Sequence, residues 1–335
     1  MAHGIVDVAR AAGVSTATVS RALRGLPNVT ESTRERVRRV AEELGYVASP
    51  SASSLASGQT RTIGLLTPWV SQWFFAHVLE GAERALRAEG FNALLHTFEV
   101  AHRPRRVELD PGTLRRRVDG VLVVGLPLER AEIAGLDALG YPLVFVGPGT
   151  PGHAVVGLDD EDVAEQAVAH LTGLGHRVIG HISGEPDDVL AWSPGVRRER
   201  GWRASMRRRG LPTDPGLTAH EGFDVAGGRA SVHRLLDARP DITAVFAASD
   251  EMALGAVLGC RDRGLRVPED VSVIGVDGIE IGEHLGLTTL VQDPGDQGAT
   301  AATMLLELIT GAPVPSEVVF EATLVERGST APPRD

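Results

Sequence analysis

The chain of 335 residues contains no lysine, so all of its positive side-chain charge apart from histidine comes from arginine. We attribute this bias to a GC-rich genome rather than to function. The single cysteine, Cys260, excludes an internal disulfide bond, and its apolar surroundings at 252–260 predict a small buried residue. No stretch reaches ~18 apolar residues and no long apolar run opens the chain, so we expect a soluble, cytoplasmic protein without a membrane segment.

The motifs of common enzyme classes are absent as well: there is no G-x-S-x-G elbow, H-E-x-x-H pair or Walker loop. Residues 147–152 match the G-x-G-x-x-G spacing, but two prolines and an apolar run replace the helix that would bind a pyrophosphate. His170 and His176 are too far apart to share one helix face as metal ligands. The pairs Asp159–Asp160 and Asp187–Asp188 fit a helix start and a solvated loop better than catalytic dyads. We therefore expect no enzyme activity, no cofactor and no metal; a nicotinamide-dependent oxidoreductase would require cofactor binding.

Charge is distributed unevenly along the chain. The formal net charge is −11, which by itself argues against a nucleic-acid partner. Up to Arg61, however, there are 8 arginines against 5 acidic residues, whereas the rest has 25 arginines against 39 acidic residues. A basic N-terminal part joined to an acidic body is the asymmetry expected when a DNA-binding domain is attached to a different domain.

Residues 5–23 predict two short helices joined by a tight turn. The first has an apolar face at i, i+3, i+4 and i+7 spacing, formed by Ile5, Val8, Ala9 and Ala12. Gly13 can adopt the positive φ that ends a helix, and the Ser15 hydroxyl can cap the next one.

The second helix has two distinct faces. Its inward face contains Val19, Ala22 and Leu23, and its outer face contains Thr16, Ala17, Ser20 and Arg21. Small and polar side chains with one guanidinium suit a helix that enters the major groove of DNA.

A third helix and an uncharged segment follow. The third helix starts at a capping residue, Thr30, and ends at Gly45; its apolar stripe is Val37, Val40, Ala41 and Leu44. Residues 49–58 are small and uncharged, which is typical of a flexible linker. Yet Pro50 and Gly58 could bracket one short helix around Leu55.

From Arg61 onward, apolar runs alternate with amphipathic helices. The runs typical of strands buried on both faces are 63–66, 121–124, 143–146, 178–182, 244–247 and 271–276. The helices between them are expected near 74–89, 160–174, 196–209, 225–237, 250–263 and 296–310. This alternation predicts parallel sheets covered by helices on both sides, and about ten strands favour two sheet subdomains over one.

Ordered motifs along nearly the whole chain give it a specific resemblance. Those in the first part are 7–9, 13–15, 18–21, 28–29, 33–37 and 44–46. Those in the body are 61–64, 118–121, 170–171, 175–176, 249–253, 267–271, 275–277 and 287–289. In these motifs the chain resembles the LacI/GalR family of bacterial transcription regulators.

The resemblance implies an all-α helix–turn–helix headpiece and an α/β core of two Rossmann-like subdomains, as in type I periplasmic binding proteins. The implied boundaries are 1–47 for the headpiece, 48–60 for a hinge helix, 61–330 for the core and 331–335 for a tail. Within the core, the N-subdomain covers about 61–158 and 292–318, and the C-subdomain covers about 159–288 and 319–330.

The resemblance also implies which residues contact DNA. Thr16, Ala17 and Arg21 would read bases, Ser15, Thr18, Ser20 and Asn28 would contact phosphates, and Leu55 of a hinge helix that forms on the operator would wedge into the minor groove. The chain departs from the family at Gly4, at Val6 and in the serine-rich hinge. These departures would lower phosphate affinity and flatten its salt dependence.

Alignment with the family places seven residues at an effector cleft: Trp73, Phe74, Trp192, Arg198, Phe223, Asp250 and Asp277. Aromatic faces stack on sugar rings, while carboxylates and a guanidinium hydrogen-bond hydroxyl groups, so a sugar or sugar derivative is expected. Structural alternatives stay open: Asp250 would cap its helix, and Trp192 would anchor a loop. Asp224 stands where the family commonly has an aromatic residue, which leaves the ligand class less certain.

Together these features predict a homodimeric repressor that binds a pseudo-palindromic operator in double-stranded DNA and responds to a small effector. The alternative is a ligand-binding protein whose headpiece has lost DNA function. The residues after Leu324 lack the leucine heptads of a tetramerising helix, so we expect no tetramer.

Overall fold

The structure is a computed structural model that describes residues 3–25, 27–46, 59–98, 109–126, 128–147, 149–184 and 193–334. It forms two compact units, Met1–Thr62 with Arg116–Asp119, and Ile63–Arg115 with Gly120–Asp335. Leu55 and most of the expected hinge helix, Trp192 and the pair Asp187–Asp188 lie outside the described residues. No helix among the described residues is long and apolar enough to cross a membrane.

The first unit contains the three helices expected from the sequence. They are α1 (Ile5–Ala12), α2 (Thr16–Leu23) and α3 (Glu31–Glu43). Gly13 ends α1 with a φ of 64°, and the Ser15 hydroxyl accepts a hydrogen bond from the Thr18 backbone N–H at 3.1 Å. Both observations confirm the predicted turn, because the left-handed conformation favours glycine and a hydroxyl satisfies a free N–H at the helix start.

Small aliphatic side chains form the interior of this three-helix unit. The buried residues are Val8, Ala9, Ala12, Val19, Ala22, Val37 and Ala41. Ile5, Leu23 and Val40 pack against them from the edge. Alanine at several of these positions lets the short helices approach closely.

The second unit contains two six-stranded sheets. The strand order of the first sheet is β11-β5-β4-β3-β1-β2, and that of the second is β12-β10-β9-β8-β6-β7. The strands of the first are β1 (Thr62–Thr67), β2 (Asn92–Thr97), β3 (Gly120–Val124), β4 (Leu143–Val146), β5 (Ala154–Leu158) and β11 (Glu317–Phe320). Those of the second are β6 (Ile179–Gly184), β7 (Thr218–Glu221), β8 (Ala244–Ala247), β9 (Ser272–Asp277), β10 (Thr288–Val291) and β12 (Thr323–Val325).

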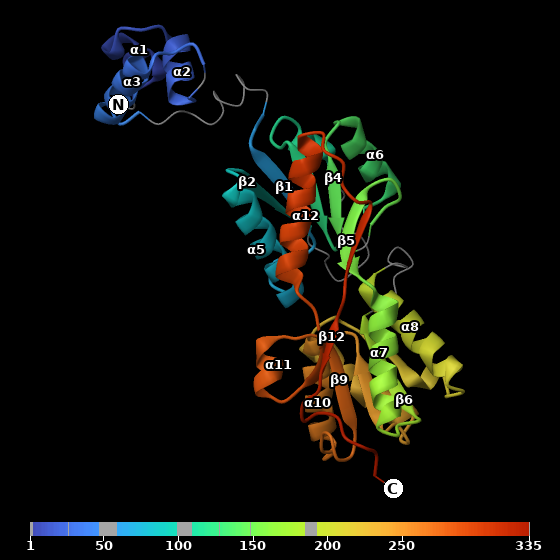
Figure 1. Ribbon diagram of the computed structural model, residues 1–335. Helices are drawn as coiled ribbons and strands as arrows, with labels where there is room; N and C mark the ends of the chain where they lie inside the picture. The colour runs from blue at the N-terminus through green and yellow to red at the C-terminus, as the bar shows by residue number, and fades with distance from the viewer. Residues whose placement is uncertain are drawn as a thin grey trace. The chain divides into compact units, whose positions relative to one another are not determined.

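Helices cover these sheets (Figure 1). The helices that follow strands of the first sheet are α5 (Trp73–Ala88) and α6 (Arg130–Ala138), and α12 (Pro294–Ile309) packs on β3, β4 and β5. The helices of the second are α7 (Asp160–Gly173), α8 (Pro194–Arg208), α9 (Val225–Ala238), α10 (Asp250–Asp262) and α11 (Glu280–His284). Short 3-10 turns occur at Pro111–Leu114 and Pro215–Leu217. The expected parallel architecture with two subdomains is confirmed, with β12 antiparallel to β10 at one edge.

The described residues form twelve strands rather than the expected ten or so, because several strands carry no continuous apolar run. β2 alternates between exposed and half-buried residues, and the short β12 is exposed or half-buried throughout. The chain passes between the sheets after β5, after β10 and after β11. β11 extends to Phe320, two residues past the expected subdomain boundary at 318.

Glycines allow α5 and α12 to pack in direct backbone contact. A Cβ on Gly81 would lie 1.9 Å from the Gly295 carbonyl oxygen, and one on Gly298 would lie 2.1 Å from the Val78 carbonyl oxygen. Such distances leave no space for any side chain, so these two helices behave as one layer on the first sheet.

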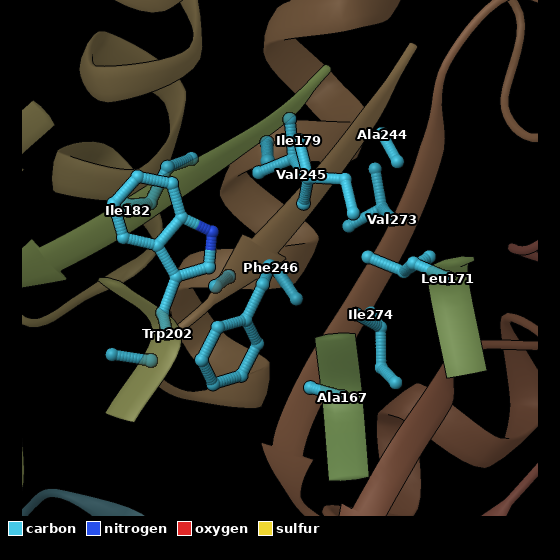
Figure 2. Close-up of a cluster of buried hydrophobic side chains, with 14 of the residues drawn as sticks. Ala167, Leu171, Ile179, Ile182, Trp202, Ala244, Val245, Phe246, Val273 and Ile274 are labelled. Atoms are coloured by element: carbon cyan, nitrogen blue, oxygen red, sulfur yellow. The ribbon is translucent and has the colours of Figure 1, made fainter. Parts of the chain in front are cut away.

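The interior of the second sheet is built from larger side chains. Figure 2 shows Trp202 of α8 and Phe246 of β8 among aliphatic residues from α7, β6 and β9. His181 lies between the two rings, 5.7 Å from the Trp202 ring and 4.8 Å from the Phe246 ring. Cys260 is buried in the same cluster, as expected.

The C-terminal residues are anchored to the second sheet. The Ser329 carbonyl oxygen accepts from the Val273 N–H at 2.8 Å, and its hydroxyl donates to the Val273 carbonyl oxygen at 2.6 Å. A ring nitrogen of His176 lies 2.9 Å from the Ala331 carbonyl oxygen. Residues 329–331 are therefore held against the start of β9, an inner strand of this sheet.

Candidate functional site

The outward face of α2 presents the residues expected to read DNA. Thr16, Ala17 and Arg21 are exposed. Arg21 takes part in no hydrogen bond or ion pair with another described residue, whereas Arg10 on α1 lies 3.6 Å from Asp7. A guanidinium with all its donors available on the second helix of a helix–turn–helix can reach base edges in a major groove.

The four residues expected to contact phosphates lie around the same helix. Ser15 precedes α2 as its cap, and its hydroxyl lies 2.9 Å from the Thr18 hydroxyl. The Ser20 carbonyl oxygen accepts a hydrogen bond from the Arg24 side chain at 3.2 Å. Asn28 is exposed and has a φ of 68°, in the left-handed region that asparagine tolerates better than most residues. Gly4 caps α1, and its N–H donates to the Asp7 carboxylate at 2.9 Å.

A second candidate site is a cleft in the α/β unit. It is lined by Phe74, Gly147, Leu158, Asp160, Pro194, Arg197, Arg198, Gln292 and Gln297. These residues come from elements of both sheets, at the carboxyl ends of strands β4, β5 and β10 and at the starts of α5, α7, α8 and α12. Open α/β sheets bind ligands at this edge.

Arg198 is buried in the cleft and ion-paired. Its Nε donates to Asp160 Oδ1 at 2.9 Å, and another guanidinium nitrogen donates to the Ala248 carbonyl oxygen. Both members of the pair are buried. A buried guanidinium fixed by two partners keeps its remaining N–H groups in one orientation, which suits recognition of hydroxyl or carboxylate oxygens.

Asp277 lies at the end of β9, in a chain of buried hydrogen bonds. Its Oδ1 accepts from the Gln292 amide at 2.6 Å, and Gln292 accepts from the Gln297 amide at 3.0 Å. Burial raises the pKa of Asp277 to about 6, while Arg198 and the Gln292 hydrogen bond oppose this shift. Its φ of 125° is unfavourable for a residue other than glycine, and such strain is concentrated at functional sites.

Asp250 is buried close to Asp277, and its carboxylate oxygens are hydrogen-bonded to other groups of the protein. Its carboxylate accepts from the N–H groups of Gly278 and Ile279 at 2.8 and 3.0 Å and from the Thr289 hydroxyl at 2.6 Å. Burial, and next the nearby charge of Asp277, raise the pKa of Asp250 to about 7. The alternative that Asp250 caps α10 is wrong, because the Ser249 hydroxyl does so. Asp250 instead holds the loop that begins α11.

Of the expected aromatic residues that the structure describes, Phe74 lines the cleft, whereas Trp73 and Phe223 are not among its lining residues. Phe74 packs edge to face against Phe75 at 5.5 Å. Phe223 lies over Gly184, where a Cβ would approach its ring to 2.8 Å. The Trp73 indole N–H donates to Glu280 Oε2 at 3.1 Å.

Asp160, Gln292 and Gln297 line the cleft but are not among the residues that the sequence places there. The pair Asp159–Asp160 is expected at a helix start, and Asp159 does cap α7 by accepting from two backbone N–H groups. Asp160 is different because it pairs with Arg198, a contact between residues far apart in the chain. One feature of the sequence could have identified Asp160: it lies close to the carboxyl end of a strand, as Asp277 does.

Within the described ranges, no group of three histidine, cysteine or acidic side chains could hold a metal ion. The cleft therefore offers hydrogen-bonding groups and one aromatic face rather than a metal centre.

The sequence matches two protein families. Residues 4–49 match "Bacterial regulatory proteins, lacI family", and residues 168–330 match "Periplasmic binding protein-like domain". Together they define a helix–turn–helix protein with a core of the ligand-binding type. The transcriptional regulator CelR of Thermobifida fusca is 36% identical over 334 residues, which cover 96% of each chain. The chain therefore belongs to the LacI family of bacterial transcriptional regulators, and it is not an enzyme.

Two solved structures extend this likeness. The Lac repressor dimer bound to operator and the anti-inducer ONPF superposes with a TM-score of 0.85 at 26% identity, covering 99% of this chain and 100% of that chain. A complex of the transcriptional regulator CelR with cellobiose gives a TM-score of 0.71 at 32% identity and covers 98% and 99%.

Proposed function

We propose that the protein is a homodimeric transcriptional repressor that binds a pseudo-palindromic operator and is controlled by a sugar-like effector. The observation that carries this proposal is the outward face of α2, where Arg21 is exposed and engaged by no described side chain. The relative that was solved as a dimer on its operator supports the same arrangement. Two headpieces related by two-fold symmetry would read two half-sites.

In this proposal Thr16, Ala17 and Arg21 read bases, and Ser15, Thr18, Ser20 and Asn28 contact phosphates. Arg21 is the long donor among the three readers, and a guanidinium typically makes a bidentate contact to guanine. Leu55 remains the candidate minor-groove wedge.

The cleft suits a ligand that carries several hydroxyl groups. Phe74 offers an aromatic face, Arg198 offers donors, Asp160 offers acceptors, and Gln292 offers both. Asp277 stays a candidate contact that accepts a hydrogen bond from Gln292. The relative that was solved with cellobiose supports a sugar as the ligand class. Binding would change DNA affinity through coupling between the two sites, and the same coupling acts in reverse. Trp73, Phe223 and Asp250 stay candidate residues of this cleft, with Asp250 in a supporting position.

Binding to a palindromic operator tests the DNA-binding function. The operator is selected from random DNA with the purified protein, and affinity is measured by gel shift at several salt concentrations. We expect Arg21→Ala to lose about 1–3 kcal/mol of discrimination between operator and scrambled DNA. Arg10→Ala removes the same charge from α1, and we expect it to keep this discrimination. Equal losses in both variants would contradict the assignment of α2, and the absence of any salt-dependent operator binding would favour a ligand sensor without DNA function.

A thermal-shift screen tests the effector. Cellobiose and a panel of mono- and disaccharides, sugar phosphates and nucleosides are added to the purified protein, because a ligand that binds the folded state raises its melting temperature. We expect at least one sugar to shift the transition of the α/β unit. A panel in which only nucleosides do so would contradict the sugar class.

A further inference from the structure

One side chain joins the helices of the two sheets beside the cleft. Glu280 is the first residue of α11, which belongs to the second sheet, and its Oε2 accepts from the indole N–H of Trp73, the first residue of α5. Trp73 precedes Phe74, which lines the cleft. Glu280 was not identified from the sequence, because nothing local marks a glutamate as the partner of a tryptophan so distant in the chain.

The contact on α5 involves two side chains that are already fixed to each other. A ring nitrogen of His77, Nδ1, lies 2.7 Å from the Trp73 carbonyl oxygen, and the two rings are 4.4 Å apart. The other ring nitrogen of His77 lies 3.8 Å from Glu280 Oε1. Both carboxylate oxygens of Glu280 therefore face the first turn of α5.

The contact on α11 starts from an anchored segment. Asp250 accepts from the N–H groups of Gly278 and Ile279, the two residues before Glu280. Asp277 precedes them at the end of β9 and is a candidate effector contact. Residues 277–280 therefore connect the partner of the cleft residue Gln292, two residues anchored by Asp250 and the partner of Trp73 in one short stretch of chain.

We propose that Glu280 is a positioning residue of the cleft: it holds Trp73 from the opposite wall and thereby keeps the two walls at a defined spacing. The proposal rests on the proposed function only in that an effector would occupy the space between these walls. Glu280 is 74% exposed, and hydrogen bonds and ion pairs of exposed groups are weak. The contact therefore biases the spacing of the walls and can be released, which suits a cleft that must admit a ligand.

Distances measured in the full-length protein without ligand test this inference. Ala88→Cys on α5 and Glu269→Cys after α10 place spin labels on exposed positions of the two subdomains that form the walls. The native Cys260 is buried, and burial raises the pKa of its thiol to about 11, so it is not labelled. Labelled chains are diluted with unlabelled protein, so that pulsed electron–electron double resonance reports the distance between the two labels of one chain.

We expect Glu280→Ala to raise the population of longer separations by about two- to fivefold. Glu283→Ala changes an exposed glutamate on the same short helix and should leave the distribution as in the parent. Glu280→Gln keeps an acceptor for the indole N–H and should restore most of the parent distribution. Trp73→Phe should reproduce the effect of Glu280→Ala, with no further change in the double variant.

A Glu280→Ala distribution identical to that of the parent would overturn the inference, as would an equal change in Glu283→Ala. These outcomes are independent of the operator and effector assays, because no DNA or ligand is present. Circular dichroism of each variant shows that a changed distribution comes from the folded protein.

Discussion

The headpiece and the α/β unit bury different kinds of side chain. Among the described residues 3–46, the buried ones are aliphatic, and every ionisable group is at least partly exposed. The α/β unit buries Glu132, Asp160, Arg198, Asp250 and Asp277. The headpiece is therefore held together by aliphatic packing. The α/β unit keeps charged groups away from water, where their free energy depends strongly on their partners.

The largest difference between the two units should follow from removing one buried charge. Arg198→Met leaves the Asp160 carboxylate buried without its cation, so we expect the α/β unit to lose about 3–5 kcal/mol of stability. Differential scanning calorimetry should show this unit melting earlier, with the headpiece transition unchanged. The neighbouring Arg197 is 38% exposed and 3.8 Å from Asp159, so Arg197→Met should cost less than about 1 kcal/mol. Similar losses of stability in the two variants would contradict the claim that burial of the Arg198–Asp160 pair causes the large effect.

A smaller but still marked effect should come from the contact between α5 and α12. Gly298→Ala places a Cβ against the Val78 carbonyl oxygen, so the helices must separate, and we expect a loss of about 1–3 kcal/mol. Gly173→Ala, near the end of α7, meets no atom within 4 Å and should leave stability unchanged or raise it slightly. Thermal denaturation of both variants measures the difference. Equal behaviour would show that the two helices are not packed in backbone contact.

The complementary prediction concerns the headpiece. Val37 of α3 is fully buried in its small aliphatic cluster, so Val37→Ala should destabilise the headpiece by about 2 kcal/mol and leave the α/β unit unaffected. Val6 is 56% exposed, and Val6→Ala should be nearly neutral. Hydrogen exchange of the headpiece amides measures both. A change in the α/β unit upon Val37→Ala would show that the two units do not melt independently.

The smallest effect is a difference in pH dependence between the units. The pKa of Asp250 is raised from 3.8 to about 7, so the folded protein binds this proton more tightly than the unfolded chain does. This contribution therefore weakens the α/β unit as the pH rises from 5 to 7. His181 acts in the opposite direction, because burial lowers its pKa to about 4. The informative quantity is therefore the difference in the free energy of unfolding between Asp250→Asn and the parent, which should shift in favour of the variant by about 1 kcal/mol between pH 6 and pH 7.

Urea denaturation at each pH measures that difference. Asp296→Asn, at the exposed start of α12, provides the control. Its difference in free energy of unfolding from the parent should stay constant over the same pH range. A difference that moves in favour of the parent as the pH rises would contradict the raised pKa of Asp250. The headpiece transition should not change with this substitution.

The parts of the fold that the sequence predicted are those determined by local patterns. The periodicity of Ile5, Val8 and Ala9, the turn at Gly13 and the cap at Ser15 are all properties of neighbouring residues, and the structure confirms them. The buried strands around Val121–Val124 were equally visible, because both faces of such strands are apolar.

The parts that the sequence did not predict depend on contacts between distant residues. Asp160 resembles any acidic residue at a helix start until Arg198 is placed beside it. Glu280 resembles any exposed glutamate until the indole of Trp73 reaches it. The family resemblance supplied Arg198 and Asp277, but it did not supply their partners, which depend on how this chain packs. The roles of the individual DNA and effector residues stay predictions that the variants above test.

The strands β11 and β12, which are close together in the chain, each form an edge of a different sheet. β11 pairs with β5 and β12 pairs with β10, so each sheet receives an edge strand that follows strands β1 to β10 in the chain. During synthesis, the emerging chain therefore carries two incomplete sheets whose open edges are templates for pairing with other chains. A premature stop within residues 317–320 would remove fewer than a tenth of the 335 residues yet interrupt β11 and delete β12, and expression should be far more sensitive to such truncations than their length suggests.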